Sequence, residues 1–224
     1  MKTLSLLLFV LLIVNVQPEK KLEKEVAYKG QQVIADLDFA SDIELKTWKK
    51  SAIKIVASVK MEDEKYKELY ELKLNSSDSN IEICSNSVEL IEAYHDEFGK
   101  RNDLKQEINY TLFVPEGVEM ELSSITGSLT SEFLQGNIRI DLVVGDVNIE
   151  KFKGNLELKS VTGKIDLPVK DSSYKAKTVM GNIHGYDPAA ARKKGLVGQE
   201  VTKDLQDSEN QLSLSTVTGD IYLN

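Results

Sequence analysis

Side chains that could carry chemistry are few in this chain of 224 residues. It has one cysteine, Cys84, and two histidines, His95 and His184. One cysteine excludes an intramolecular disulfide and any zinc or iron–sulfur site that needs several thiolates. The sequence also lacks a His-Glu-x-x-His, Gly-x-Ser-x-Gly or Cys-x-x-Cys motif and a phosphate-binding glycine loop. We therefore predict a protein that is not an enzyme and that has no catalytic residues, no metal and no cofactor.

Three carboxylates on expected strands, Asp146, Asp166 and Asp220, leave one enzymatic alternative open. Glycosidic cleavage needs two carboxyl groups about 5–9.5 Å apart, and stacked strands could bring such a pair together. Columns of outward polar residues produce pairs of this kind routinely, so a carbohydrate-active β-helix enzyme is the less favoured interpretation.

Charge and the N-terminal residues indicate where the protein works. The formal net charge of −8 argues against nucleic-acid binding, which needs a basic face. Lys2 precedes an apolar run from Leu4 to Val16, too short for a membrane-spanning helix of about 20 residues but typical of a signal peptide. We predict a signal peptide over residues 1–18 and a flexible segment over 19–30. The mature protein would be exported, to the periplasm, the outer surface or the medium, with no membrane span. An uncleaved N-terminal anchor is the alternative.

Glycines that recur at a nine-residue step are the strongest signal in the chain. The residues around them repeat at eighteen, so that Val143-Val144-Gly145-Asp146-Val147 corresponds to Val161-Thr162-Gly163-Lys164-Ile165. Between glycines, apolar and polar residues alternate as in strands with one buried face. Because nine is odd, the alternation must break once in each half-unit, at pairs such as Leu142-Val143, and glycine permits a corner. The structural repeat glycines are Gly127, Gly136, Gly145, Gly154, Gly163, Gly181 and Gly219.

Two nine-residue halves make an eighteen-residue rung, and a single rung cannot bury its own apolar face. We therefore predict an all-β fold, a single-stranded parallel β-helix or β-solenoid over residues 31–224. An antiparallel meander is the alternative, but the linkers lack the Asn-Gly and Asp-Gly pairs of tight hairpins. A calcium-binding nonapeptide repeat would need more glycines in each unit than the single one found here. Two inward columns are expected, one of Ile125, Val143, Val161 and Val179 and one of Leu129, Val147, Ile165 and Ile183.

Two insertions, at about 86–105 and 185–209, interrupt this pattern. In the second, Asp187, Pro188 and a later Gly195 enclose a basic stretch and predict a short helix. The chain ends directly after the strand-like residues 219–223. Its last rung would expose an edge through which the protein could self-associate, unless the 185–209 insertion covers it.

A second short helix is expected over Asp63–Leu72. Its apolar residues Tyr66, Leu69 and Tyr70 would lie on one side of that helix.

The run Tyr110–Val118, followed by repeated Val-Thr-Gly-Asp-Ile units, resembles the bacterial putative-adhesin family. Residues 42–48 and 53–57 resemble that family's first strands, and the resemblance covers roughly residues 30–224. It implies a β-solenoid domain of unknown function, common in cell-envelope proteins, with no catalytic residues to carry over.

The function that we predict is an exported, non-catalytic cell-envelope protein, an adhesin or binding scaffold that presents flat polar β-faces. Its partner would be a protein or a glycan of the envelope. The alternative is a periplasmic protein-interaction module in an envelope-sensing or regulatory system.

Overall fold

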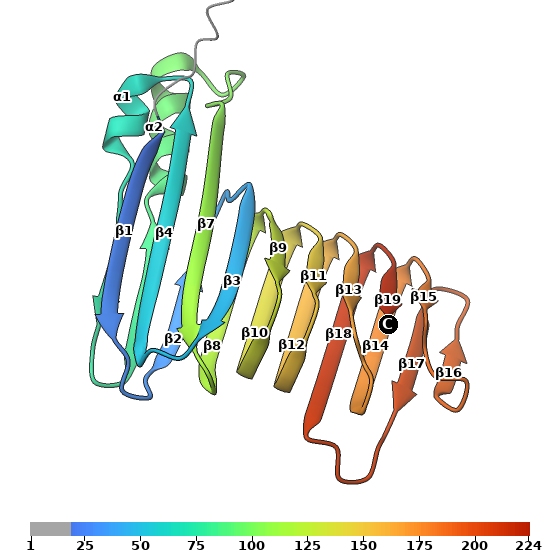
Figure 1. The fold of residues 1–224 in the computed structure, drawn as a ribbon. Coiled ribbons are helices and arrows are strands. Elements are labelled where there is room, and N and C mark those ends of the chain that lie inside the picture. Colours follow the sequence, from blue (N-terminus) through green and yellow to red (C-terminus); the bar gives the residue numbers. More distant parts are fainter. Residues whose placement is uncertain (1–18) are drawn as a thin grey trace, which may run out of the picture.

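The computed structural model describes residues 19–224, which form two long β-sheets joined at a row of corners (Figure 1). The nine-stranded sheet has the order β1 (Lys20–Ala27), β4 (Ala52–Met61), β7 (Gln106–Pro115), β3 (Asp42–Trp48), β9 (Ser128–Ser131), β11 (Val147–Ile149), β13 (Ile165–Leu167), β19 (Ile221–Leu223) and β15 (Ile183–His184). The ten-stranded sheet has the order β16 (Ala191–Lys194), β17 (Gln199–Lys203), β14 (Ser172–Met180), β18 (Asn210–Thr218), β12 (Phe152–Thr162), β10 (Leu134–Val144), β8 (Val118–Thr126), β2 (Gln32–Asp36), β6 (Asn80–Ser85) and β5 (Leu72–Ser76). The all-β prediction is confirmed, and the sheets mix parallel and antiparallel pairs.

From β8 onward the chain passes from one sheet to the other and back in regular steps. In the parallel pair β10–β12, Gly136 lies opposite Gly154. In the parallel pair β11–β13, Val147 lies opposite Ile165. Both pairs join residues eighteen positions apart, which is the offset that the repeated glycine motifs predict.

The C-terminal strands lie inside the stack, which corrects the prediction of an exposed last rung. β18 pairs in parallel with both β12 and β14, and β19 pairs in parallel with both β13 and β15. Residues 210–223 therefore separate 152–167 from 172–184, although the latter two follow each other in the chain. Because β18 and β19 each have a strand on either side, the C-terminal rung offers no edge for self-association.

The 185–209 insertion forms a β-hairpin in place of the predicted helix. Asp187 begins a turn, in which its Oδ1 accepts the N–H of Ala189 and its carbonyl accepts the N–H of Ala190. The basic residues that follow form β16, because they pair with β17, which itself pairs antiparallel with β14. The insertion thus covers the end of the ten-stranded sheet that β14 would otherwise expose.

The edge strand β16 carries Arg192, Lys193 and Lys194, and such charges on an edge discourage pairing with another chain. We expect the triple variant Arg192→Thr/Lys193→Val/Lys194→Thr to associate at concentrations where the parent protein does not, as measured by light scattering. The substitutions change the formal charge from −8 to −8 − 3 = −11, which by itself opposes association. Association of the variant would therefore identify the edge as its cause, and an unchanged scattering profile would contradict the protective role.

The N-terminal part of the described chain extends the nine-stranded sheet. Residues 19–30 are predicted to be flexible, but Lys20–Ala27 form β1, which pairs antiparallel with β4. Lys20 fixes the start of this strand, since its Nζ donates to the carbonyl oxygens of Glu68 and Tyr70 at 2.7 and 3.2 Å. The predicted signal peptide, residues 1–18, lies outside the described residues.

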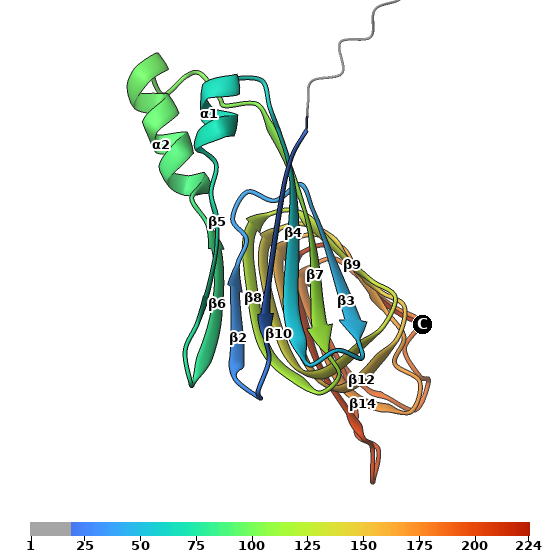
Figure 2. The ribbon, with the colours of Figure 1, turned by 60° about the vertical axis from the view of Figure 1, so that its left-hand side comes forward.

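Two helices, α1 (Glu64–Leu69) and α2 (Ser87–Phe98), stand at one end of the sheets (Figure 2). The prediction of a helix after Asp63 is confirmed, and the Asp63 carboxylate accepts the N–H of Lys65 at 2.9 Å. Tyr66 is buried as expected, whereas Leu69 is 51% exposed. α2 occupies most of the 86–105 insertion.

Glycines stand at the corners because neighbouring rungs approach too closely for a side chain. A Cβ on Gly145 would lie 2.1 Å from the carbonyl oxygen of Gly127, and one on Gly163 would lie 2.0 Å from that of Gly145. Hydroxyl groups on the adjacent strands donate to several of the corner carbonyls: Ser160 Oγ to Gly145 O at 3.2 Å, Thr216 Oγ1 to Gly163 O at 3.4 Å and Thr178 Oγ1 to Gly219 O at 3.0 Å. The same close approach, to a backbone oxygen at 2.0–2.3 Å, is found at the corner glycines Gly181 and Gly219, and also at Gly136 and Gly154, which lie within β10 and β12.

The core lies between the two sheets. The second predicted column is buried, and Val147 and Ile165, for example, are 1% and 0% exposed. Ile221 joins this column between Ile165 and Ile183, because the C-terminal rung is inserted there.

Candidate binding surface

The side of the ten-stranded sheet that faces away from the core is open, and its central part is the candidate site. We call it the outer face: the outward residues of β2, β8, β10, β12, β18 and β14. These six strands are parallel to one another. Residues in register on adjacent strands stand about 4.8 Å apart, so the outward side chains form columns across the sheet.

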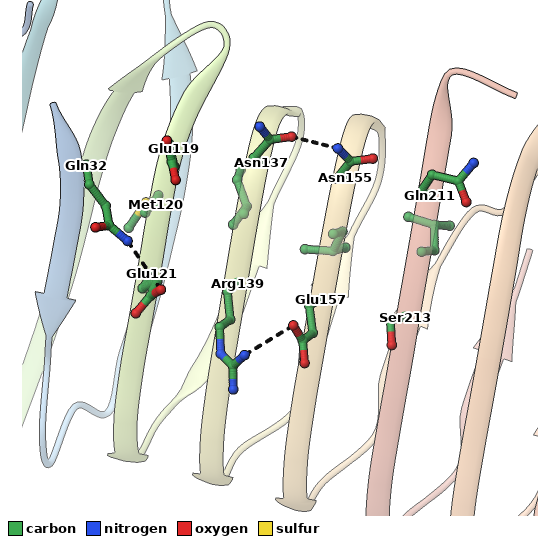
Figure 3. A pocket seen from close by; sticks show the side chains of 13 residues that line it. Gln32, Glu119, Met120, Glu121, Asn137, Arg139, Asn155, Glu157, Gln211 and Ser213 are labelled. Carbon is green, nitrogen blue, oxygen red and sulfur yellow. Dashed lines mark hydrogen bonds and ion pairs between the residues drawn. The ribbon is translucent and has the colours of Figure 1, made fainter. Parts of the chain in front are cut away.

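Polar side chains form the first two columns of the outer face and line a shallow groove of about 480 Å³ (Figure 3). Asn155 Nδ2 donates to Asn137 Oδ1 at 2.8 Å, and Arg139 Nη1 donates to Glu157 Oε2 at 3.2 Å. The first column contains Glu119, Asn137, Asn155 and Gln211, and the second contains Glu121, Arg139, Glu157, Ser213 and Lys175. The two columns therefore mix donors and acceptors across four and five adjacent strands of the sheet.

Charges in these columns are paired but remain accessible. Arg139 also contacts Asp141 at 2.7 Å, and Lys159 contacts Glu157 at 2.5 Å. The hydrogen bond from Lys159 holds the pKa of Glu157 below its usual range. The side chains of Arg139, Asp141, Glu157 and Lys159 are 39–45% exposed, so these pairs add little to stability and can still contact a partner.

An apolar column on the outer face corrects one of the two predicted inward columns. Ile125, Val143, Val161 and Val179 point outward, with exposed fractions of 37, 46, 47 and 36%. Val217, at 42%, stands between Val161 and Val179. We call these five residues the apolar column. They line a groove of about 540 Å³ along the edge of the outer face nearest the corners.

The orientation of Val143 follows from an alternation that is unbroken up to this residue. Arg139 and Asp141 face outward, Leu142 is buried, and Val143 continues the outward series. The phase changes after Val143, at the corner Val144-Gly145-Asp146, and not at Leu142-Val143 as predicted. Val147 then faces inward.

A third polar column lies directly beside the apolar column. It contains, in spatial order, Asp36, Ser123, Asp141, Lys159, Ser215 and Lys177. Ser123 Oγ is hydrogen-bonded to Asp36. Asp38 lies at the end of the groove beyond Ile125, where burial raises the pKa of its carboxyl group.

The carboxylates considered for glycosidic cleavage make contacts on β13 and at the corners that precede β11 and β19. Asp146 Oδ1 accepts the N–H of Lys164 at 2.7 Å, and Asp166 forms an ion pair with the Lys164 side chain at 2.8 Å. Asp220 Oδ2 contacts His184 Nε2 at 2.9 Å, and this hydrogen bond lowers the pKa of Asp220. Each carboxylate thus has a structural partner.

The remaining reactive side chains lie far from one another in the fold. Cys84 is half-buried on β6, where burial raises the pKa of its thiol. His184 is on β15 and stacks on Tyr222 with ring centroids 4.6 Å apart, whereas His95 is on α2. Within residues 19–224, no group of three or more His, Cys, Asp or Glu side chains is arranged to hold a metal ion. Among the same residues, neither helix has the length and apolarity needed to cross a bilayer.

The stacked parallel strands, the glycine corners and the open outer face define an all-β protein with a polar and an apolar groove on exposed sheet surface. The chain belongs to the toastrack DUF4097 family, whose model matches residues 39–224. Among curated proteins, no sequence matches the chain.

Two solved structures resemble this chain at low sequence identity, and the first of them shares its fold. A putative cell adhesion protein from Clostridium sporogenes is 14% identical, with a TM-score of 0.59, over 92% of this chain and 99% of that protein. A putative adhesin from Bacteroides fragilis is also 14% identical, over 92% of this chain and 97% of that one, with a TM-score of 0.34. The resemblance to an adhesin family that the sequence motifs indicate is thus confirmed at the level of family and fold.

Proposed function

We propose that this protein is an exported, non-catalytic adhesin-like protein of the cell envelope, and that the outer face is its binding surface. The repetitive part, residues 118–184 and 210–223, is then a single-stranded parallel β-helix of eighteen-residue rungs that serves as the scaffold for this face. Export rests on the apolar run Leu4–Val16, and the adhesin-like role is supported by the similarity to the putative cell adhesion protein from Clostridium sporogenes. The mature protein would work in the periplasm, on the outer surface or in the medium.

One observation carries the proposal: a polar groove and an apolar groove lie side by side on one open sheet surface. Donors and acceptors repeat at about 4.8 Å along each column, and this suits an extended partner that repeats its own polar groups. Glycans and extended protein segments are partners of this kind. The apolar column adds surface that can be removed from water on binding.

The proposal is tested with the fluorescently labelled protein on isolated bacterial cell envelopes and on a glycan array. We expect the triple variant Asn137→Ala/Arg139→Ala/Asn155→Ala to lose at least about tenfold in affinity, because it removes the central donors and acceptors of the polar groove. The matched control Glu44→Ala/Lys60→Ala/Thr111→Ala changes outward residues of the nine-stranded sheet and should bind within about twofold of the parent.

Equal losses in the outer-face variant and the control would contradict the role of the outer face. Release of reducing sugar from an array polysaccharide would favour the glycosidase alternative. The envelope-sensing alternative predicts that the protein binds a membrane signalling protein, through the apolar groove, and binds no glycan. The result that distinguishes this alternative is co-purification with such a partner, which the substitution Val161→Asp should abolish.

A further inference from the structure

We propose that the outer face binds the outer face of a second copy of this chain, across a two-fold axis that runs parallel to the strands between β10 and β12. This inference rests on the proposed binding role of the same face and names its partner. In such a pair, β10 of one copy lies over β12 of the other, β8 lies over β18, and β2 lies over β14. In a two-fold interface the same patch contacts itself, so the residues of the outer face must be complementary to their own reversed order across the axis.

The third polar column is self-complementary in charge. From β2 to β14 it runs acid, serine, acid, lysine, serine, lysine. Reversing this order by the two-fold axis places Asp141 opposite the second copy's Lys159 and Asp36 opposite its Lys177. The two serines, Ser123 and Ser215, face each other. Every charge in this column therefore meets the opposite charge.

The other two polar columns are compatible with the same axis. In the second column, Arg139 comes opposite the second copy's Glu157, and Glu121 comes opposite its Ser213. At the rim of this column Lys175 comes opposite Ile34, so that pair contributes no charge complementarity. In the first column, Asn137 faces Asn155, and amides can pair with each other as donor and acceptor. Moving the axis by half a strand spacing, to lie on β12, would instead place Lys159 opposite itself. Moving it by a full spacing, to lie between β12 and β18, would place Arg139 opposite Lys175. The charges thus disfavour both of these shifts.

Four of the five residues of the apolar column meet one another across this axis. Ile125 comes opposite Val217 of the second copy, and Val143 comes opposite Val161. Val179, on β14, comes over the second copy's β2 and has no counterpart from the apolar column there. These side chains are 37–47% exposed in the single chain, and an apolar column of this length on a soluble protein marks a contact surface. Contact with the second copy removes this apolar surface from water.

Net charge also favours this face over the rest of the molecule. Its three polar columns hold five acidic residues (Asp36, Glu119, Glu121, Asp141, Glu157) and four basic ones (Arg139, Lys159, Lys175, Lys177), a sum of 4 − 5 = −1. The whole chain carries −8. Two copies of an acidic protein repel each other least through a nearly neutral surface.

The size of the outer face matches a small specific interface. Six strands at about 4.8 Å spacing span about 24 Å, and six steps along a strand span about 20 Å. The product, about 480 Å² on each copy, gives about 1,000 Å² for the pair, which is at the lower limit for a specific contact. Flat sheets also pack face to face in this manner within β-sandwich proteins.

The test is sedimentation equilibrium of the purified protein over a range of concentrations. We expect a monomer–dimer equilibrium that Lys159→Asp weakens at least about tenfold, because it places an acid opposite Asp141 of the second copy. Asp141→Lys should weaken it similarly. The double variant Asp141→Lys/Lys159→Asp reverses both signs and should return the dissociation constant to within about threefold of the parent. Rescue by the double variant is a result that a merely structural role of either residue would not produce.

Cross-linking tests the register of the two copies. In a Cys84→Ser background, a mixture of the Val143→Cys and Val161→Cys proteins should form more disulfide-linked dimer than either protein alone. A parent protein that is monomeric up to about 1 mM, a dimer insensitive to the single reversals, or equal cross-linking in all three samples would each overturn the inference. If the protein is monomeric but still binds cell envelopes, the proposed function stands and only the dimer is overturned. If it neither dimerises nor binds envelopes, the proposed function is overturned as well.

Discussion

Replacing Val147 with aspartate is expected to lower the free energy of unfolding by about 4 kcal/mol, because it buries a carboxylate without a partner. Val147 is 1% exposed and lies between Leu129 and Ile165 in the inward column of the nine-stranded sheet. These neighbours are wholly apolar, so they offer the new carboxylate no hydrogen-bond donor. Urea denaturation followed by circular dichroism measures the effect, as a lower midpoint at an unchanged slope.

The control is the same substitution four residues earlier, on the other side of the glycine corner. Val143 is 46% exposed on the outer face, so Val143→Asp should change the free energy of unfolding by no more than about 0.5 kcal/mol. Both variants are compared with the parent at a protein concentration low enough to avoid association. Equal losses in the two variants would mean that Val143 is buried. An unchanged Val147→Asp midpoint would mean that the inward column is wrongly assigned.

Only one of the two predicted inward columns proved to be buried, and the reason is local. Valines stand on both sides of Gly145. The repeat pattern alone does not decide whether an apolar residue next to a corner faces the core or the outer face. The alternation that precedes the corner does contain the answer, since Arg139, Asp141 and Val143 share one parity. Applying that parity up to Gly145 would have placed Val143 outward from the sequence alone.

The order of the rungs could not have been predicted from the repeats. Each rung presents nearly the same residues to both neighbours, so Val217-Thr218-Gly219 stacks on Val161-Thr162-Gly163 as well as Val179-Met180-Gly181 does. What decides the order is the path of residues 185–209, which cross back along β14 as β17 before β18 begins. The residue types at Asp187 and Pro188 fit a helix start as well as they fit the observed turn. The pairing of the following residues in the sheet depends on tertiary structure, which local residue preferences do not contain.

The polar columns of the outer face were predicted only as flat polar surface. An eighteen-residue offset relates Arg139 to Glu157 and Asn137 to Asn155, so these pairs are implied once the strands are known to be parallel and in register. The charge order of the third column depends in addition on the inserted C-terminal rung, which places Ser215 between Lys159 and Lys177. Self-complementarity of the face is therefore a property that only the three-dimensional order reveals.

Replacing Gly145 with alanine is expected to lower the free energy of unfolding by about 3 kcal/mol, the upper range for forcing one extra carbon into a packed site. The new Cβ would lie 2.1 Å from the carbonyl oxygen of Gly127, and backbone cannot move aside as a flexible side chain does. Gly145 is not one of the described glycines with a positive φ, so alanine at this position adds no backbone strain. The loss in stability would therefore measure the close approach of two rungs.

Gly30→Ala is the matched control, because alanine at this position would have an unfavourable positive φ but would contact no neighbouring strand. Its φ is +96°, and no described atom lies within 4 Å of the position its Cβ would take. That variant should lose only about 1 kcal/mol. If Gly145→Ala cost no more than Gly30→Ala in the same urea titration, the rungs would have to separate at the corner at little cost. The nine-residue glycine spacing would then reflect the conformational freedom of glycine, and stacking distance would have no part in selecting it.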